Sequence, residues 1–259
     1  MLVGIDHLVV VVPHLDEASE RLATGLGIEV GGGGVHPTLG TANRLAWFGD
    51  SYLELLAITD PGVAAGSWLG RPAMRLLAGH PAGAFVTFAL ASDDLAGDVA
   101  AATAGGSPLS GPLPGERQRP DGEVVRWSLA VPPLIGPGMP PFLIEHDAGG
   151  AEWRPTDREA RRAAVHPLGG PVRLAALTIA VADPPVVVAA YRSTLGLPRT
   201  SVDGGGDPPG LTVTVGAQRS VLRRPGDDVE PPVRIDLMTA GGRAGSIDLF
   251  GCRFVVRPA

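Results

Sequence analysis

The stretch "HLVVVVPHLDEASERLATGLGI", residues 7–28, decides the fold, because its pattern occurs three times in the chain. It can be laid without a gap on "ALTIAVADPPVVVAAYRSTLGL", residues 176–197, and more loosely on "FVTFALASDDLAGDVAAATAGG", residues 85–106. Each copy reads as a β-strand, a turn and a helix. Self-similarity of this kind indicates that one structural unit has been duplicated.

Runs with β-strand character follow each strand–helix copy. They cover residues 44–48 and 51–58, then 124–131 and 141–147, then 211–215, 219–222, 233–239 and a last stretch ending near 256. A strand and a helix followed by consecutive strands form an α+β order, not the alternation of a doubly wound sheet. The sequence therefore predicts an α+β fold of repeated βαβββ modules.

The helix of the first copy is expected from about Asp16 to Leu26. Ala18, Leu22 and Leu26 recur every four residues and form an apolar stripe. Gly27 follows as a natural helix stop. These features predict an amphipathic helix that packs against the strands of its own module.

Two ionisable residues interrupt apolar strand-like runs of the first module. His7 stands in "GIDHLVVVV" and Glu54 in "DSYLELLAI". Strict alternation puts His7 on one face of its strand, and Asp6 and Leu8 on the other. A buried ionisable group is costly unless it is paired or bound to a metal. His7 and Glu54 therefore predict a polar site on neighbouring strands.

Composition excludes several classes of protein. The 259 residues are 44% hydrophobic and 19% charged, with a net charge of −6, and no basic stretch is interleaved with aromatic residues, so nucleic-acid binding is not expected. All 21 basic residues are arginine, which excludes catalysis by lysine. The single Cys252 excludes an internal disulfide. No apolar run is long enough to span a membrane, so a soluble cytoplasmic protein is expected.

The repeat, with a histidine on its first strand and a glutamate on its fourth, resembles the vicinal oxygen chelate superfamily and, more closely, its glyoxalase-like domain branch. The segments that carry the resemblance are "GIDHLVV", "GGGGVHPTLGTANRLAWFGDSYLELLAI", "RPDGEVVRWSLA" and "PPFLIEHD", within residues 4–147. It implies two modules in residues 1–147 that form a cup-shaped sheet. Residues 148–170 are then a linker, and residues 171–259 a third module without a site of its own.

The resemblance also implies a divalent metal (Mn, Fe, Ni or Zn) held by the first and fourth strands of each module. His7 and Glu54 fit the positions of the first module. In the second module the first-strand position falls on Thr87 or Val86, which are poor ligands. The last-strand position is best matched by Glu145, and its neighbour His146 lies on the opposite face. His7, Glu54 and Glu145 are thus the expected metal ligands.

Three further residues are candidates for binding a substrate. His36 lies in the glycine-rich loop that edges the groove in the resembling family, and Asn43 follows it. Arg126 could hold an anionic group, since arginine matches a carboxylate with two hydrogen bonds. Structural alternatives stay open: His7 as a core histidine, Glu54 paired with Arg126, and His36 and Arg126 exposed to solvent.

Two functions compete. The first is a metal-dependent lyase, isomerase or dioxygenase acting on a small oxygen-rich molecule, with Glu54 and Glu145 as the catalytic carboxylates. The second is a metal-free protein that binds or sequesters a small organic molecule in the same cup. Either protein would have a small molecule as its partner, and the resemblance implies a homodimer as one state.

Overall fold

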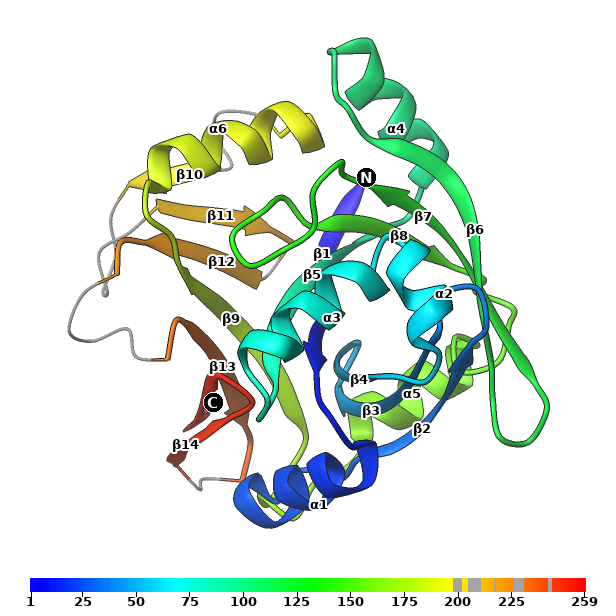
Figure 1. The fold of residues 1–259 in the computed structure, drawn as a ribbon. Coiled ribbons are helices and arrows are strands. Elements are labelled where there is room, and N and C mark those ends of the chain that lie inside the picture. Colours follow the sequence, from blue (N-terminus) through cyan, green and yellow to red (C-terminus); the bar gives the residue numbers. More distant parts are fainter. Residues whose placement is uncertain (198–201, 205–210, 217, 226–230, 242–243) are drawn as a thin grey trace.

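A computed structural model describes residues 1–197, 202–204, 211–216, 218–225, 231–241 and 244–259. Two sheets make up the fold, an eight-stranded closed barrel and a seven-stranded sheet (Figure 1). In Figure 1 the seven-stranded sheet lies to the left of the barrel. No helix among the described residues is long and apolar enough to cross a membrane.

Two βαβββ modules build the barrel. The first consists of β1 (Leu2–Val11), α1 (Leu15–Leu26), β2 (Gly31–His36), β3 (Thr41–Phe48) and β4 (Ser51–Ile58). The second consists of β5 (Ala84–Ser92), α4 (Leu95–Ala104), β6 (Ser110–Gln118), β7 (Val124–Val131) and β8 (Phe142–His146). The barrel order is β1-β4-β3-β2-β6-β7-β8-β5. The prediction of repeated βαβββ modules is therefore confirmed.

The strand pairings of the two modules are equivalent. Strand β1 runs parallel to β4 and antiparallel to β5, and β5 in turn runs parallel to β8. His7 is paired with Tyr52 across the first module, as Ala89 is paired with Phe142 across the second. Strands β1 and β5 thus each have one parallel neighbour from their own module and pair antiparallel with each other.

Helix α1 has the features that its sequence predicts. Its buried residues are Ala18, Leu22 and Leu26, and it ends at Gly27, whose φ of 65° lies in the left-handed region. Glycine adopts that conformation at no steric cost, so the chain can leave the helix towards β2.

The barrel closes where β2 meets β6, through the pair Val35 and Gln118. The strands approach each other so closely that a Cβ atom on Gly34 would clash with the carbonyl oxygen of Gln118. The glycine-rich segment expected to be a loop is thus the strand that closes the barrel. Strand β6 (Ser110–Gln118) lies in "SGPLPGERQ", a segment whose proline and glycine content does not predict a strand.

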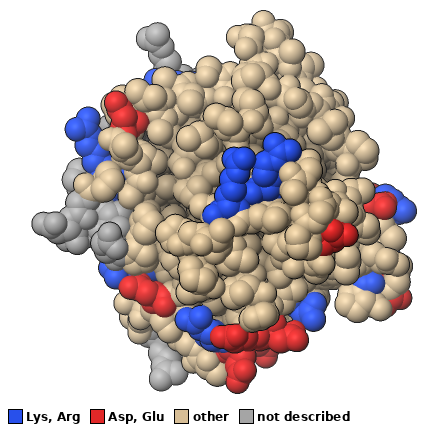
Figure 2. Space-filling view, viewed as in Figure 1, with Lys and Arg blue, Asp and Glu red and all other residues tan. Residues whose placement is uncertain are grey.

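Two helices between the modules cover one end of the barrel. They are α2 (Pro61–Gly66) and α3 (Gly70–Gly79), and neither was predicted from the sequence. Leu69 and Ala73 pack there against the inward side chains of Val9, Val11 and Leu56. Figure 2 shows this face of the molecule, on which charged side chains lie mainly near the edges, with one basic group near the centre. This end of the barrel is closed by apolar packing.

The C-terminal sheet repeats the order of the barrel. After α5 (Pro155–Ala163) it contains β9 (Val172–Ala180), α6 (Pro184–Leu195), β10 (Val202–Gly204), β11 (Leu211–Val215), β12 (Gln218–Arg223), β13 (Val233–Thr239), β14 (Gly245–Leu249) and β15 (Cys252–Pro258). Its order β10-β11-β12-β9-β13-β15-β14 corresponds to β2-β3-β4-β1-β5-β8-β7 in the barrel. A third βαβββ module is thus followed by three strands that pair as part of a fourth.

The largest hydrophobic core lies between the barrel and this sheet. It joins outward side chains of the barrel, such as Leu8, Leu55 and Phe88, to Leu177 and Phe254 of the sheet. Helix α1 also contacts β14, and α4 contacts α6. One continuous core therefore fixes the sheet against the outer wall of the barrel, and the barrel interior is left for other residues.

Candidate functional site

A β-bulge in β1 places two neighbouring polar side chains at the barrel interior. The pairing of β1 with β5 shifts register between Ile5 and His7, and Ile5 and Leu8 both face the outer core. Asp6 and His7 are both buried as a result, and His7 Nδ1 lies 2.7 Å from Asp6 Oδ1. The alternation that put Asp6 on the face of Leu8 is therefore wrong at this position, because a bulge changes which way a side chain points.

Glu54 lies on β4 with its carboxylate in the barrel. Asn43 Nδ2 on β3 donates a 2.7 Å hydrogen bond to Glu54 Oε1, and the other oxygen, Oε2, lies 3.6 Å from His7 Nε2. Asn43 itself is fixed because its Oδ1 accepts a hydrogen bond of 2.9 Å from the backbone of Gly34. The predicted pair of His7 and Glu54 is thus brought together inside the barrel.

His36 completes this polar group from β2. Its Nε2 lies 3.5 Å from Asn43 Nδ2 and 4.0 Å from Glu54 Oε1, and its Nδ1 lies 3.1 Å from Thr41 Oγ1. Desolvation by burial lowers the pKa of His36 to about 4; the charge of Arg117 lowers it too, while that of Glu54 opposes the shift. A neutral His36 accepts at Nε2 and donates from Nδ1, so it helps to hold the Asn43 amide in place.

Asp6 connects His7 to a second histidine, His146 at the end of β8. A carboxylate only accepts hydrogen bonds, so His7 Nδ1 and His146 Nε2 both donate to Asp6 Oδ1, the second over 3.1 Å. Burial of Asp6 acts to raise its pKa, but the charges and hydrogen bonds of His146 and His7 outweigh burial and lower it. Desolvation lowers the pKa of His146 against the opposing effect of Asp6. An ionised Asp6 therefore keeps the Nδ1 proton on His7.

The rest of the cavity wall is mainly aromatic. All four tryptophans of the chain line it, namely Trp47, Trp68, Trp127 and Trp153. Tyr52 stacks on His7 with ring centres 4.5 Å apart, and Trp153 stacks on His146 at 3.5 Å. The cavity that remains between these side chains has a volume of about 40 Å³. Side chains thus fill most of the interior.

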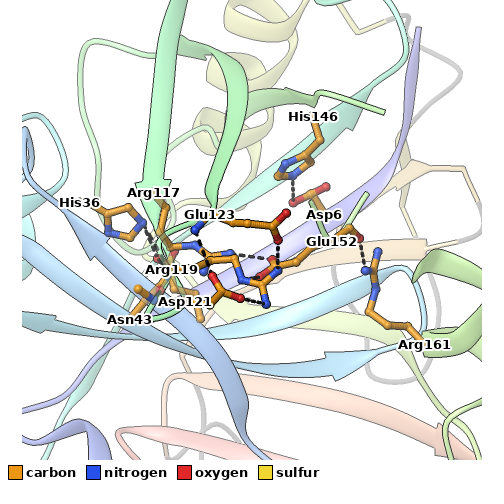
Figure 3. A network of polar contacts seen from close by, with 12 residues as sticks. Asp6, His36, Asn43, Arg117, Arg119, Asp121, Glu123, His146, Glu152 and Arg161 are labelled. Carbon is orange, nitrogen blue, oxygen red and sulfur yellow. Dashed lines mark hydrogen bonds and ion pairs between the residues drawn. The ribbon is translucent and has the colours of Figure 1, made fainter. Parts of the chain in front are cut away.

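A buried ion pair lies beside these groups (Figure 3). Arg117 Nη2 on β6 lies 2.6 Å from Glu152 Oε2, and their side chains are 4% and 14% exposed. Glu152 belongs to the turn between β8 and α5, so the pair ties that turn to the barrel wall. Among the described residues, Arg117 Nη1 is buried without a hydrogen-bond partner.

The structure places two of the expected site residues away from this group. Glu145 Oε2 accepts a 2.8 Å hydrogen bond from the backbone nitrogen of Leu95 at the start of α4, and Glu145 does not line the cavity. Arg126 is 65% exposed and lies 3.6 Å from Glu116. Of the two neighbours Glu145 and His146, it is His146 that points into the barrel.

The residues in the barrel do not fit a resident divalent metal. His7 Nε2 and Glu54 Oε2 have a spacing that two ligands of one ion could take. The ligand expected from the second module, Glu145, does not line the cavity, however, and neither Thr87 nor Val86 lines it. Among the described residues, no three His, Cys, Asp or Glu side chains gather as a metal group. Without a third ligand gathered around His7 and Glu54 in the described part of the chain, the pair falls short of the three protein ligands that a transition metal takes.

What the group can do chemically follows from its hydrogen bonds. Glu54 has one oxygen fixed by Asn43 and the other turned towards His7 Nε2. Because Asp6 holds the proton of Nδ1, His7 Nε2 is the atom that can gain or lose a proton. A carboxylate and an imidazole at this spacing can pass a proton to and from a molecule bound beside them.

Sequence reasoning missed three residues of this site. Asp6 was hidden by the bulge, which alternation does not reveal. Arg117 stands on β6, whose proline and glycine content conceals the strand. Glu152 lies in the segment expected to be a linker, where "GGAEW" offers one usable signal, a tryptophan next to a carboxylate in an otherwise polar stretch.

Comparisons with known proteins agree with this fold. Residues 5–195 match the family described as "Glyoxalase-like domain". A hypothetical protein from Staphylococcus aureus has a crystal structure that matches with a TM-score of 0.77 and 16% identity, over 98% of this chain and 99% of that one. No curated protein matches the chain.

Methylmalonyl-CoA epimerases match a smaller part. The enzyme of Streptomyces coelicolor, in complex with 2-nitronate-propionyl-CoA, matches with a TM-score of 0.43 and 22% identity over 58% of this chain and 99% of that one. The enzyme of Mycobacterium tuberculosis matches with a TM-score of 0.42 and 18% identity over 56% of this chain and 88% of that one. The Staphylococcus aureus structure thus extends over both sheets, and the epimerases over little more than half of the chain.

Proposed function

Since this chain belongs to the glyoxalase-like domain family, we propose that its barrel binds a small organic molecule with an aromatic or otherwise apolar body and a carbonyl oxygen. We further propose that Glu54 and His7 transfer a proton on that molecule, as in an isomerase or lyase. The observation that carries the proposal is the convergence of Glu54, His7 and Asn43 on one cavity whose remaining wall is largely aromatic.

Glu54 Oε2 accepts a proton from the carbon next to the carbonyl, and the electron pair of that C–H bond forms an enolate. The Arg117 guanidinium, which lines the same cavity, stabilises the negative oxygen. Glu54, or His7 Nε2 after receiving the proton, then returns it to carbon. No step is routed through a metal, because the described residues around His7 and Glu54 supply too few ligands for one.

Asp6 and Asn43 have positioning roles in this scheme. Asp6 holds His7 in the tautomer with its proton on Nδ1, and Asn43 holds the Glu54 carboxylate in one orientation. Both side chains are buried, so water does not compete for the hydrogen bonds that fix these orientations. Such fixed hydrogen bonds are what a site for proton transfer needs, since they remove reorganisation from the reaction.

A second function, binding without turnover, is favoured by one specific observation. The carboxylate expected from the second module, Glu145, does not line the cavity and accepts a hydrogen bond from the backbone of Leu95 instead. A protein that only sequesters its ligand needs an aromatic cavity and a few polar groups for orientation. In that case Glu54 and Asn43 would orient the ligand, and no proton would move.

The experiment uses a panel of aryl ketones and α-keto acids. Binding is followed by tryptophan fluorescence, and proton transfer by NMR as loss of the C–H signal next to the carbonyl in D2O. We expect enzyme-dependent exchange that falls at least about 100-fold in Glu54→Gln, a loss within the usual range for a general base. Glu145→Gln is the matched control, because that carboxylate lies outside the cavity, and it should keep the full rate.

Three outcomes decide between the two functions. Exchange that survives Glu54→Gln contradicts the assigned role of this carboxylate. Binding without exchange leaves the sequestering function. A panel in which no member changes the fluorescence contradicts a small-molecule site in the barrel.

A further inference from the structure

Arg117 is the only arginine that lines the barrel cavity within the described part of the chain. Its side chain is 4% exposed, and a buried guanidinium needs acceptors for its N–H groups. Nη2 has Glu152, whereas Nη1 has no hydrogen-bond partner among the described residues. A free carboxylate would suit this group, because the two oxygens of a carboxylate match the two outer nitrogens of a guanidinium.

The carboxylate that Arg117 does contact comes from outside the barrel strands. Glu152 reaches in from the turn after β8, and its backbone φ of 69° is one that few residues other than glycine adopt. Glu152 Oε2 contacts Arg117, while Oε1 lies 3.7 Å from Arg119 Nε (Figure 3). The turn thus delivers one carboxylate to a pair of arginines.

The same turn fills the barrel and closes it towards a larger cleft. Trp153 stacks on His146, and Arg161 donates a hydrogen bond to the Glu152 carbonyl and lies 4.0 Å above the ring of Trp47. His146 and Trp153 line both the barrel cavity and a cleft of about 870 Å³ beside the C-terminal sheet. The barrel cavity has room for only about three water molecules, so a ligand of the size of benzoate requires part of the lining to withdraw. Trp153 has this cleft beside it, and Glu152 is its neighbour in the same turn.

We propose that Arg117 selects a ligand that bears a carboxylate, and that Glu152 occupies the position of this carboxylate until the ligand displaces it. The inference rests on the proposed function, whose substrate class it narrows. Exchange of one carboxylate for another keeps the buried guanidinium paired in both states. A neutral ligand that displaced Glu152 would leave the Arg117 guanidinium buried without a counter-charge, which costs free energy. The site should therefore bind carboxylates in preference to neutral ligands.

The first test removes the internal carboxylate and supplies a free one. In Glu152→Ala we expect acetate and formate to bind saturably, at least tenfold more tightly than in the wild type, as followed by tryptophan fluorescence at constant ionic strength against chloride. The double variant Glu152→Ala/Arg117→Met should lose this binding. Glu152→Gln, which keeps the shape of the side chain, serves as a second variant, and circular dichroism checks the fold of each.

Glu123→Ala is the matched control. It removes a half-exposed carboxylate that lies 3.2 Å from Arg119 but leaves Glu152 on Arg117, so it should bind acetate as weakly as the wild type. Equal acetate affinity in Glu152→Ala, Glu152→Gln and the wild type would overturn the proposal. So would acetate binding that survives the loss of Arg117.

A second test separates this inference from the proposed function. Benzoate and benzamide have the same size and differ in charge. We expect benzoate to bind at least tenfold more tightly than benzamide, and Glu152→Gln to strengthen the binding of benzoate alone. Equal binding of the two would refute the selection of a carboxylate and leave the small-molecule site intact. If neither binds, the proposed function loses its support, and the acetate result still decides the role of Arg117.

Discussion

The barrel and the C-terminal sheet have the same strand order but very different interiors. His7 is paired with Tyr52, and Val9 with Glu54, in the barrel. The same register in the sheet pairs Ala176 with Arg219 and Thr178 with Val221. The positions of His7 and Glu54 are therefore taken by Ala176 and Val221. The two regions therefore share a strand topology, and the side chains at a few positions determine whether that topology carries a polar site.

Closure is the second difference. The barrel closes through β2 and β6, and in the described residues the C-terminal sheet has no counterpart of β6. The closed barrel surrounds an interior that contains polar groups. The C-terminal sheet instead packs against the barrel through apolar side chains such as Leu177 and Phe254. The duplicated unit thus supports the barrel from outside. The predictions below test this division of roles, from the largest expected effect to the smallest.

The shared core predicts that the two regions unfold together. Phe254 in the sheet and Phe88 in the barrel are 0% and 1% exposed and belong to the same core. Phe254→Ala and Phe88→Ala should each lower the free energy of unfolding by about 3–5 kcal/mol, in one cooperative transition. Denaturant unfolding followed by circular dichroism measures both. A Phe254→Ala protein with an early transition of the sheet and an unchanged barrel transition would show independent units.

The buried histidine of the barrel predicts acid sensitivity that the sheet does not share. The pKa of His36 falls from 6.5 to about 4 on folding, so between these pH values the unfolded chain holds a proton that the folded protein lacks. Stability should therefore fall as the pH drops from 6.5 to 4, by about 3 kcal/mol from this residue. The lowered pKa of His146 acts in the same direction.

The variant His36→Gln isolates this contribution. The substitution also changes contacts with Thr41 and Asn43, and these changes alter the free energy of unfolding at every pH. The quantity to compare is therefore the slope of the free energy of unfolding against pH. We expect a shallower slope between pH 6.5 and 4 in His36→Gln than in the wild type. Equal slopes in urea unfolding would contradict a buried neutral His36.

Barrel closure predicts a difference between two glycines. A Cβ on Gly34 would clash with the Gln118 backbone where β2 meets β6, whereas nothing lies within 4 Å of a Cβ on Gly245 in β14. Gly34→Ala should destabilise the protein by about 1–3 kcal/mol, a typical effect of overpacking. Gly245→Ala should change stability by less than about 0.5 kcal/mol. Thermal melting of the two variants compares them, and equal melting temperatures would argue against a tight closure.

The donor count predicts a small response to metals. With two ligands, His7 and Glu54, gathered in the described part of the chain, Mn, Ni or Zn at millimolar concentration should raise the melting temperature by no more than about 1 °C after chelation, since weak binding adds little to RT ln(1 + [L]/Kd). His7→Ala should respond like the wild type. A rise of several degrees that disappears in His7→Ala would restore the metal site that the resemblance implied.

The sequence predicted most of the repeat and named four residues that the structure brings together, namely His7, His36, Asn43 and Glu54. Periodicity located α1 and β1 because their apolar patterns are strong and local, and isolated ionisable residues in those patterns pointed to His7 and Glu54. Strands β2 and β6 were missed because "GGGGVH" and "SGPLPGERQ" have little intrinsic strand preference; pairing across the barrel makes them strands. Because β6 was missed, Arg117 was not recognised as a candidate for substrate binding, and Arg126 was predicted in that role.

Local shape explains the remaining misses. The bulge that turns Asp6 inward depends on the pairing of β1 with β5, which one strand alone does not encode. Glu145 and His146 were correctly seen as alternatives, since neighbours on a strand face opposite ways, but the choice between them follows from how β8 sits in the barrel. Glu152 approaches the site from a turn, and only the folded chain brings it to Arg117.

The most direct test of a site confined to the barrel is an NMR titration of the tryptophan side chains. The four indole N–H signals belong to residues that all line the cavity, and the sequence from residue 171 onward has no tryptophan. With benzoate as the probe, we expect these indole signals to shift along one saturable curve, while the backbone amides of β11 and β14, which do not line the cleft beside Trp153, stay unchanged. Unmoved indole signals together with shifted amides in β9–β15 would contradict a site confined to the barrel, because the ligand would then lie on the sheet.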